Sequence, residues 1–267
     1  MKCKWIKKLT AGIIFLAAVG SLSGCQKAAT SENLFRDIEV NMTSVESAEE
    51  NQIVKLQMGD GDSAISQESN LDIEMTRDPA AVHRKGQQKT NMAGTKETQE
   101  MESYQVEEDG KTVIYSGTDE AWEKNAVEEK ETSSQQTLLF DGLQNLSGAF
   151  SVSQDLATVN KEECFELTGT ISGTQFQETF ADTLKALLGE DSSDLSGWNL
   201  QASEDEENNE ELQQKLNNVK VDCVIDIYRS NILPAKITFD LTDYLKAAGE
   251  ENAQVTSYTL EVTFCVL

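Results

Sequence analysis

The side chains that most often do chemistry in proteins are scarce in this sequence, which holds a single histidine and five cysteines. The histidine, His83, lies in the polar stretch 81–86, and no cysteine stands near it at a spacing typical of zinc ligands. We therefore expect no metal centre and no cofactor, and we expect His83 to be exposed and without a functional role.

Three cysteines, Cys164, Cys223 and Cys265, lie in segments whose alternating apolar residues are typical of strands. An odd number of cysteines permits at most one bridge within this set, so three pairings stay open. Free cysteine also behaves as a small buried apolar residue, and this is the more frequent role in such segments. The sequence therefore predicts buried thiols or one disulfide, without deciding between them.

Motifs that mark enzymes are missing as well. A Ser–His–Asp arrangement would have to use His83, but no G-x-S-x-G turn holds a serine. Neither G-x-x-x-x-G-K-[ST] nor G-x-G-x-x-G occurs, and pairs of carboxylates are expected by chance among 47 acidic residues. An envelope hydrolase is therefore a distant third hypothesis, and we expect a protein that is not an enzyme.

The start of the chain has the features of a secretory signal. Four lysines precede the apolar run 9–19, which is too short to span a bilayer as a permanent helix, and small residues follow it. The run ends in Leu22-Ser23-Gly24-Cys25, which resembles the bacterial lipobox, in which the cysteine becomes the first mature residue. We expect residues 1–24 to be a lipoprotein signal peptide.

The lipobox resemblance implies that Cys25 carries diacylglycerol and an acyl chain such as palmitate. Several acyl chains hold a protein on a membrane much better than one does. Residues 25–32 are then a lipidated tether, and the protein lies on the extracytoplasmic face of the cell membrane. The type of bacterial envelope is left open.

The net charge of −25 limits the possible partners. A surface so acidic repels phosphate backbones and anionic headgroups, and no basic stripe with interleaved aromatic residues appears. We therefore expect no nucleic-acid binding, and membrane attachment through the acyl group at Cys25 instead of through charge.

Four segments have the apolar spacing of helices. Leu34, Phe35, Ile38, Met42 and Val45 share one helical face, and the segment 139–150 carries Leu139, Leu143, Leu146 and Phe150. The clearest helix is Thr174–Leu188, for which Thr174 and Gln177 form a candidate capping box. A short helix is expected over Thr242–Ala248. Residues at about 190–211 are acidic and nearly without apolar groups, which indicates a mobile, solvated insertion.

Alternating apolar residues predict strands around 54–58, 71–76, 104–115, 165–171, 221–227, 237–241 and 258–266. Asp109-Gly110 is a strong hairpin signal. Trp122 falls in a further extended piece, and Pro234 stands where a strand can begin. Strands and helices in this order are typical of the α+β class, with one antiparallel sheet covered by helices.

A lipobox, an amphipathic helix after the tether, the segment "DGKTVIY" with "AWEK", and the closing "VDCVIDIYRSNILPAKITFDLT" together resemble the LolA/LolB-like (LppX/LprG-like) lipoprotein superfamily. They look closest to a Gram-positive lipoprotein family of unknown function within it. The resemblance implies that residues 33–267 form a single domain. It also implies a curved antiparallel sheet, an incomplete β-barrel covered by helices, whose concavity holds acyl chains.

Two functions therefore compete. In the first, the protein binds or carries an apolar or amphiphilic, lipid-like ligand between sheet and helices, because a twisted sheet under a straight helix leaves a concave gap. Phe176, Phe180 and Leu184 are the candidate wall residues of that gap. In the second, it is an acidic interaction protein of the envelope surface, with a filled core and no small ligand. The apolar stripe of the helix would look the same in both.

Overall fold

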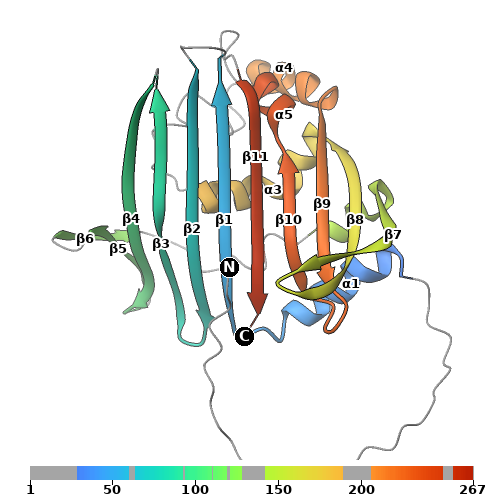
Figure 1. Ribbon diagram of the computed structural model, residues 1–267, viewed down its shortest axis with the longest axis horizontal. Helices are drawn as coiled ribbons and strands as arrows, with labels where there is room; N and C mark the ends of the chain where they lie inside the picture. The colour runs from blue at the N-terminus through green and yellow to red at the C-terminus, as the bar shows by residue number, and fades with distance from the viewer. Residues whose placement is uncertain are drawn as a thin grey trace, which may run out of the picture.

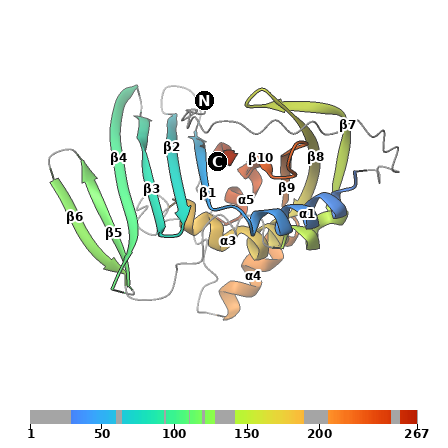
Figure 2. The same ribbon diagram turned by 90° about the horizontal axis from the view of Figure 1, so that it is seen from below.

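The structure is a computed structural model that describes residues 29–59, 64–92, 94–109, 111–118, 121–127, 142–188, 206–248 and 255–266. An antiparallel sheet of eleven strands curves across the molecule, and the helices lie on one side of it (Figures 1 and 2). We call this side the helix face and the opposite side the outer face. The α+β class and the curved antiparallel sheet with helices are confirmed.

The strands run in chain order through both halves of the sequence. They are β1 (Ser47–Met58), β2 (Ile65–Arg77), β3 (Ala80–Met92), β4 (Thr95–Glu108), β5 (Lys111–Thr118), β6 (Ala121–Val127), β7 (Phe150–Val159), β8 (Glu162–Ser172), β9 (Lys220–Tyr228), β10 (Pro234–Asp240) and β11 (Val255–Val266). The helices are α1 (Ser31–Met42), the 3₁₀ helix η2 (Leu143–Ala149), α3 (Gly173–Leu188), α4 (Glu206–Asn217) and α5 (Thr242–Ala248).

The strand order is β6-β5-β4-β3-β2-β1-β11-β10-β9-β8-β7. Two runs of neighbouring antiparallel strands, β1 to β6 and β7 to β11, are thus joined where β1 pairs with β11 along the whole length from Ala48 to Met58. The last strand of the chain therefore lies in the middle of the sheet, and β6 and β7 are its two edges.

The hydrophobic core lies under the helices, on the half of the helix face formed by β7 to β11. Every second residue of β9 is buried there, from Val221 to Ile227, and α1 adds Phe35, which contacts Phe150 of β7 edge to face at 5.2 Å. Helix α1 begins at Ser31, inside the predicted tether 25–32, and Thr30 caps it by accepting a hydrogen bond from the Asn33 N–H at 3.3 Å.

Two glycines in the other half of the sheet stand where a side chain does not fit. A Cβ atom on Gly86 of β3 would stand 2.0 Å from the Asn70 carbonyl oxygen, and one on Gly117 of β5 would stand 2.1 Å from that of Ala121. Glycine inside a strand marks such close approaches of one backbone to another.

Several predicted elements are confirmed. The hairpin at Asp109, which has a φ of 53°, joins β4 to β5, and Pro234 opens β10. Trp122 lies in β6, and α5 spans Thr242–Ala248 as expected. The predicted helix over 139–150 is wrong in part: a 3₁₀ helix covers Leu143–Ala149 and Phe150 already begins β7. Residues 139–141 of that prediction lie outside the described residues.

The predicted capping box of α3 is also wrong, since the box lies two residues earlier. Ser172 Oγ accepts a hydrogen bond from the Gln175 N–H at 3.1 Å, and Gln175 Oε1 accepts one from the Ser172 N–H at 3.0 Å. The hydroxyl of Thr174 instead donates to Asn217 Oδ1 of α4 at 2.9 Å. The helix therefore follows β8 without a linker.

The insertion predicted at 190–211 is corrected at its end. Residues 206–211 belong to α4, whose Leu216 is fully buried in the core. Leu212 packs against the same core one turn earlier, so the helix gains an apolar face in its second half. Residues 190–205 lie outside the described residues.

Candidate functional site

The predicted wall residues of α3 lie in a packed aromatic cluster. Phe176 is 0% exposed and Phe180 is 1% exposed. Their rings are 5.4 Å apart, and both contact Phe239 of β10, at 5.2 and 4.9 Å between ring centroids. Tyr244 of α5 completes the cluster at 5.1 Å from Phe176. These four rings pack α3 and α5 against β10.

Two predicted site residues cannot be placed in the same way. The side chain of Leu184, one turn after Phe180, lies outside the described residues, although its backbone belongs to α3. Cys25 also lies outside the described residues. Helix α3 passes behind β10, β11 and β1 (Figure 1), so the segment that contains Leu184 lies on the β1 side of the aromatic cluster.

The sequence prediction missed a row of residues that crosses the helix face just beyond this core. The strand register places Phe264 of β11, Glu50 of β1, Ile73 of β2, Arg84 of β3 and Ser103 of β4 side by side. Residues paired across antiparallel strands point to the same face. The row therefore changes from fully apolar at β11 to polar at β4.

Glu50 is the unusual member of this row because it is 3% exposed and flanked by Phe264 and Ile73. Within the described part of the chain, its Oε1 atom has no hydrogen-bond partner. Burial raises the pKa of Glu50 to about 8, and the positive charge of Arg84 opposes that rise. Glu50 is therefore mostly a neutral acid at pH 7, which can donate as well as accept a hydrogen bond.

Arg84 is half-buried two strands away, and burial lowers the pKa of its guanidinium while Glu50 raises it. Its Nη1 donates a hydrogen bond of 3.4 Å to Gln105 Oε1 on β4. An arginine stays cationic at pH 7 in such surroundings, and its planar guanidinium suits carboxylate and phosphate oxygens. Arg84 thus places a cation beside the apolar surface.

Around this pair, apolar and polar side chains alternate on the helix face. Gln52, which is 2% exposed, pairs with Leu71 in the next row, and Met75 pairs with Val82 in the row before. Exposure rises from the buried residues of β1 to the half-buried residues of β3 and β4. We call the residues Glu50, Gln52, Leu71, Ile73, Met75, Val82 and Arg84 the amphipathic lining.

The amphipathic lining could have been found by extending one pattern. The alternation of Val54, Leu56 and Met58 continues backwards through Gln52, Glu50 and Ala48, which places both polar residues on the inward side. Polar residues at those positions are usually a sign that a strand has ended, so the prediction began the strand at Val54.

Cys164 and Cys223 do not form a reactive centre, and Cys265 is disulfide-bonded. Cys164 and Cys223 are free and buried, so none of the three possible pairings is present. Burial raises the pKa of Cys164 to about 11 and raises that of Cys223 further. Both thiols therefore stay protonated and act as small apolar side chains, as the sequence favoured. Among the residues with described positions, no cluster of three or more His, Cys, Asp or Glu could hold a metal ion.

His83 is less exposed than predicted, and its lack of a functional role stays a prediction. Its side chain is 25% exposed, its Nε2 lies 2.9 Å from Glu102 Oε1, and its ring stacks on Tyr104 with centroids 4.2 Å apart. His83 lies on the outer face, where Tyr104 and Glu102 contact its ring. The sequence analysis missed this because residues 80–92 form a strand that their polar sequence did not reveal.

These features define an α+β protein built on one open, curved antiparallel sheet, whose helix face changes from an apolar core to an amphipathic lining. The chain belongs to a family of unknown function (DUF6612), whose model matches residues 30–257. Membership in a family of unknown function is thereby confirmed. None of the helices in the described ranges has the length and apolarity to cross a membrane.

Solved structures similar to this chain include one lipoprotein. LppX from Mycobacterium tuberculosis is 11% identical over 88% of this chain and 93% of that chain, with a TM-score of 0.44. LprF from Mycobacterium bovis is 11% identical over 88% and 91%, with a TM-score of 0.45. A putative outer membrane lipoprotein-sorting protein domain from Vibrio parahaemolyticus is 8% identical over 89% and 93%, with a TM-score of 0.25. No curated protein sequence matches the chain. The function has to be inferred from the chain's own residues.

Proposed function

We propose that the protein is a lipid-anchored protein of the cell envelope, not an enzyme, and that it binds an amphiphilic, lipid-like molecule along the amphipathic lining. The observation that carries this proposal is Glu50, a buried acid with an unpartnered oxygen between two apolar side chains. Binding sites for small molecules combine apolar walls with a few polar groups that fix the orientation, and often contain a group with a shifted pKa.

The ligand's polar head lies at Glu50 and Arg84 in this proposal. The guanidinium of Arg84 suits a carboxylate or phosphate group, and a neutral Glu50 does not repel one. The apolar chain lies against Leu71, Ile73 and Met75 of β2, of which the last two are buried. An amphiphile with an anionic head matches both halves of this surface.

Helix α3 bounds the apolar end of the site. Phe176 and Phe180 hold this helix to β10, and Leu184 belongs to the turn that continues toward β1. A contact between a ligand and these three residues stays a prediction. The close packing of Phe176 and Phe180 is also what favours the second candidate, the acidic interaction protein with a filled core.

The anchor is the other part of the proposal. The sequence Leu22-Ser23-Gly24-Cys25 supports acylation of Cys25 after removal of residues 1–24. The domain would then lie on the extracytoplasmic face of the cell membrane, tethered by the residues between Cys25 and the start of α1 at Ser31. A lipid-like ligand would be within reach of a protein held at that surface.

A titration separates the two candidates. The chain without residues 1–24, with Cys25→Ala, is mixed with a fluorescent fatty-acyl probe at pH 7, and its solvent extract is analysed by mass spectrometry. We expect saturable micromolar binding that Arg84→Gln weakens about tenfold, equivalent to about 1.4 kcal/mol. Arg36→Gln, on the exposed side of α1, is the matched control and should change nothing. No acyl binding and no extracted lipid would favour the acidic interaction protein.

A further inference from the structure

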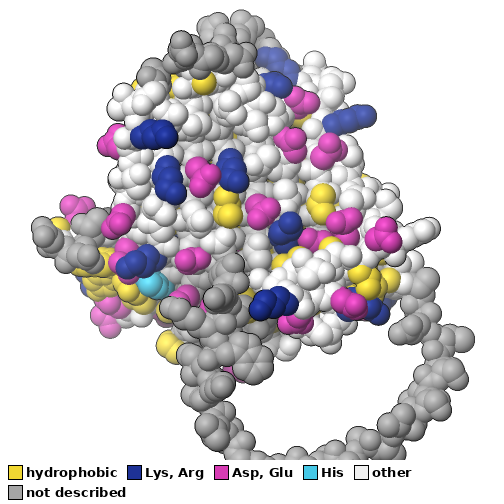
Figure 3. Space-filling view, viewed as in Figure 1, with side chains coloured by type: hydrophobic (Ala, Val, Ile, Leu, Met, Phe, Trp, Pro, Cys, Tyr) yellow, Lys and Arg dark blue, Asp and Glu magenta, His cyan; other side chains and the backbone are white. Residues whose placement is uncertain are grey.

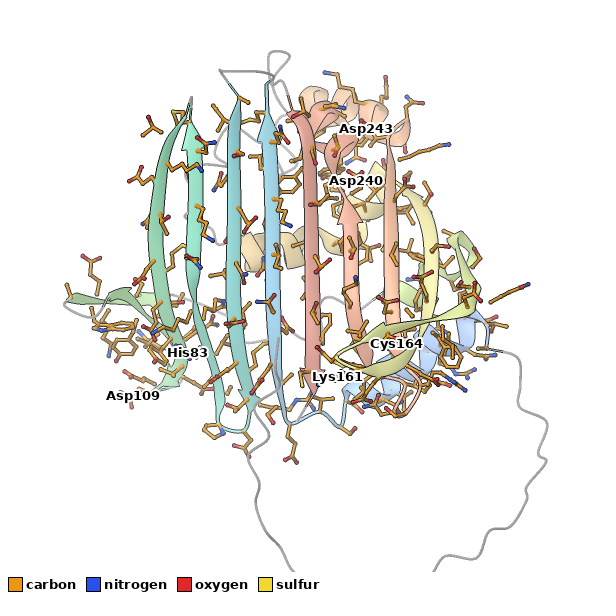
Figure 4. All side chains as sticks on the ribbon, in the orientation of Figure 1. His83, Asp109, Lys161, Cys164, Asp240 and Asp243 are labelled. Carbon is orange, nitrogen blue, oxygen red and sulfur yellow. The ribbon has the colours of Figure 1, made fainter. Side chains whose placement is uncertain are left out.

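A cluster of aromatic side chains lies on the outer face, on the opposite side of the sheet from the amphipathic lining. Three rings touch in a row: His83 of β3 stacks on Tyr104 of β4 with centroids 4.2 Å apart, and Tyr104 contacts Trp122 of β6 at 5.5 Å. Tyr104 is 39% exposed and Trp122 is 43% exposed. Figure 3 shows hydrophobic side chains gathered beside the histidine on this face, and Figure 4 labels His83 on the side of the sheet where β3 to β6 lie. Large aromatic groups at this exposure mark an interaction surface.

The sheet itself brings the rings together. Gly117 of β5 pairs with Trp122, so no side chain stands between β4 and β6 at that level. The same glycine cannot be replaced without moving β6, because its Cβ would lie 2.1 Å from the Ala121 carbonyl oxygen. The contact between Tyr104 and Trp122 therefore depends on a position where the backbone tolerates only glycine.

Two glutamates beside the rings, Glu102 and Glu108, are paired with lysines. Glu102 accepts hydrogen bonds from Lys85 Nζ at 3.0 Å and from the Tyr104 hydroxyl at 3.3 Å, and its Oε1 lies 2.9 Å from His83. Next to it, Glu108 accepts hydrogen bonds from Lys124 and from the Tyr115 hydroxyl, both at 2.7 Å. Lys85 and Lys124 thus offset the charges of Glu102 and Glu108, and Glu74, 3.8 Å from His83 Nδ1, is a further carboxylate beside the rings. This surface is much less acidic than the net charge of −25 for the whole chain would suggest.

Charge selects the class of ligand. An anionic polymer would be repelled by a protein with this net charge. A cationic partner would find Glu102 and Glu108 already occupied by the chain's own lysines. A second copy of the chain would bring the same negative charge with it. What fits an exposed aromatic row with paired carboxylates at its rim is a neutral ligand with apolar faces and hydroxyl groups.

We propose that the outer face of β3 to β6 binds a neutral glycan, with Trp122 and Tyr104 as the rings on which pyranose units stack. The C–H faces of a pyranose are apolar and pack on an aromatic ring, while the ring's hydroxyls need hydrogen-bond partners at its edge. Carboxylate oxygens accept hydrogen bonds at several positions, so Glu102 can accept from a hydroxyl while it holds Lys85. This site is separate from the amphipathic lining, which lies on the opposite face.

Co-sedimentation of the full chain in mild detergent with three insoluble neutral glycans, chitin, cellulose and starch granules, tests the proposal. We expect saturable binding to at least one of these polymers, with the dissociation constant raised at least tenfold by Trp122→Ala and by Tyr104→Ala. Trp122→Phe, which keeps a ring, should restore most of the binding. Leu156→Ala is the matched control, because Leu156 is also 43% exposed but lies in β7 at the opposite edge.

Absence of binding to all three polymers would overturn the proposal, as would binding that Trp122→Ala and Leu156→Ala leave equally strong. Binding to polylysine-coated beads that Trp122→Ala abolishes would assign the cluster to a cationic partner and would also overturn it. Trp122→Ala should leave acyl-probe binding unchanged, so this result and that for the amphipathic lining are independent.

Discussion

Glu50 and Arg84 stand two strands apart in one row of the helix face, with Ile73 of β2 between them. The acid is 3% exposed, whereas the arginine is half-buried. Because burial keeps Glu50 protonated at pH 7, the two groups do not cancel each other's charge there. This relationship makes both stability and ligand binding dependent on pH.

The pH dependence of stability is the first prediction. An unfolded Glu50 loses its proton near its ordinary pKa of 4.5, while the folded protein retains it up to about pH 8. The folded state therefore binds more protons between these values, and its stability falls as the pH rises through that window. The contribution is at most about 1.4 kcal/mol per pH unit. Denaturant unfolding of Glu50→Gln should show a flatter dependence than the wild type.

The comparison is best made between pH 6 and 8, because Asp226 is also buried and its pKa is raised to about 6 by desolvation. Asp226 also lowers the stability of the folded state as the pH rises, and most of that loss has occurred by pH 6. Glu49→Gln, one residue away on the outer face, is the control and should keep the wild-type slope. Equal slopes for Glu50→Gln and the wild type would contradict the prediction.

The second prediction concerns the packing role of Phe180. Truncation to alanine removes a ring that is 1% exposed and contacts Phe176 and Phe239, so the free energy of unfolding should fall by about 3–5 kcal/mol. Val40→Ala, at 62% exposure on α1, should stay within about 0.5 kcal/mol of the wild type. A loss of under about 1 kcal/mol for Phe180→Ala would mean that its surroundings open easily, as a ligand-binding wall would.

A third prediction tests where α3 begins. Ser172→Ala removes the cap acceptor of the Gln175 N–H and should cost about 1 kcal/mol of stability. Thr174→Ala removes only an exposed bond to Asn217 and should cost less than about half as much. Thermal or denaturant unfolding of the two variants decides the order. A larger loss of stability for Thr174→Ala than for Ser172→Ala would show that Thr174 caps the helix after all.

The fourth prediction concerns anchoring. Cys25→Ala in the full-length chain removes the only thiol in the lipobox sequence, so the mature domain should leave the membrane fraction. Fractionation after a salt wash measures this directly. Cys164→Ala, which removes a buried thiol, should remain with the membrane. Sedimentation of a Cys25→Ala protein whose signal has been removed would show that another feature holds it there.

Elements with one apolar and one polar face could be predicted from the sequence. Helix α1 and strands β8 to β11 follow the spacing of their buried residues, because burial of one face repeats with the period of the backbone. The hairpin at Asp109 was also predictable, since its positive φ depends on local residue preference.

Strand β3 was missed because its sequence, residues 80–92, is polar on both faces. No burial pattern is present in such a strand, and its place is decided by hydrogen bonds to β2 and β4. The contacts of His83 with Tyr104 and Glu102 were missed for the same reason. A ring stack between Tyr104 and His83 depends on a register that only the pairing of two strands defines.

The sequence by itself determined the acidic charge, the absence of common catalytic motifs and the α+β class, because each of these depends on residue type or local spacing. Only the tertiary structure decided that Glu50 points into the core and stands in a row with Arg84, and that Trp122 reaches Tyr104 across Gly117. The physical reason is that residues far apart in the chain become neighbours only through the register and bend of the sheet, and polar side chains leave no periodic trace of either.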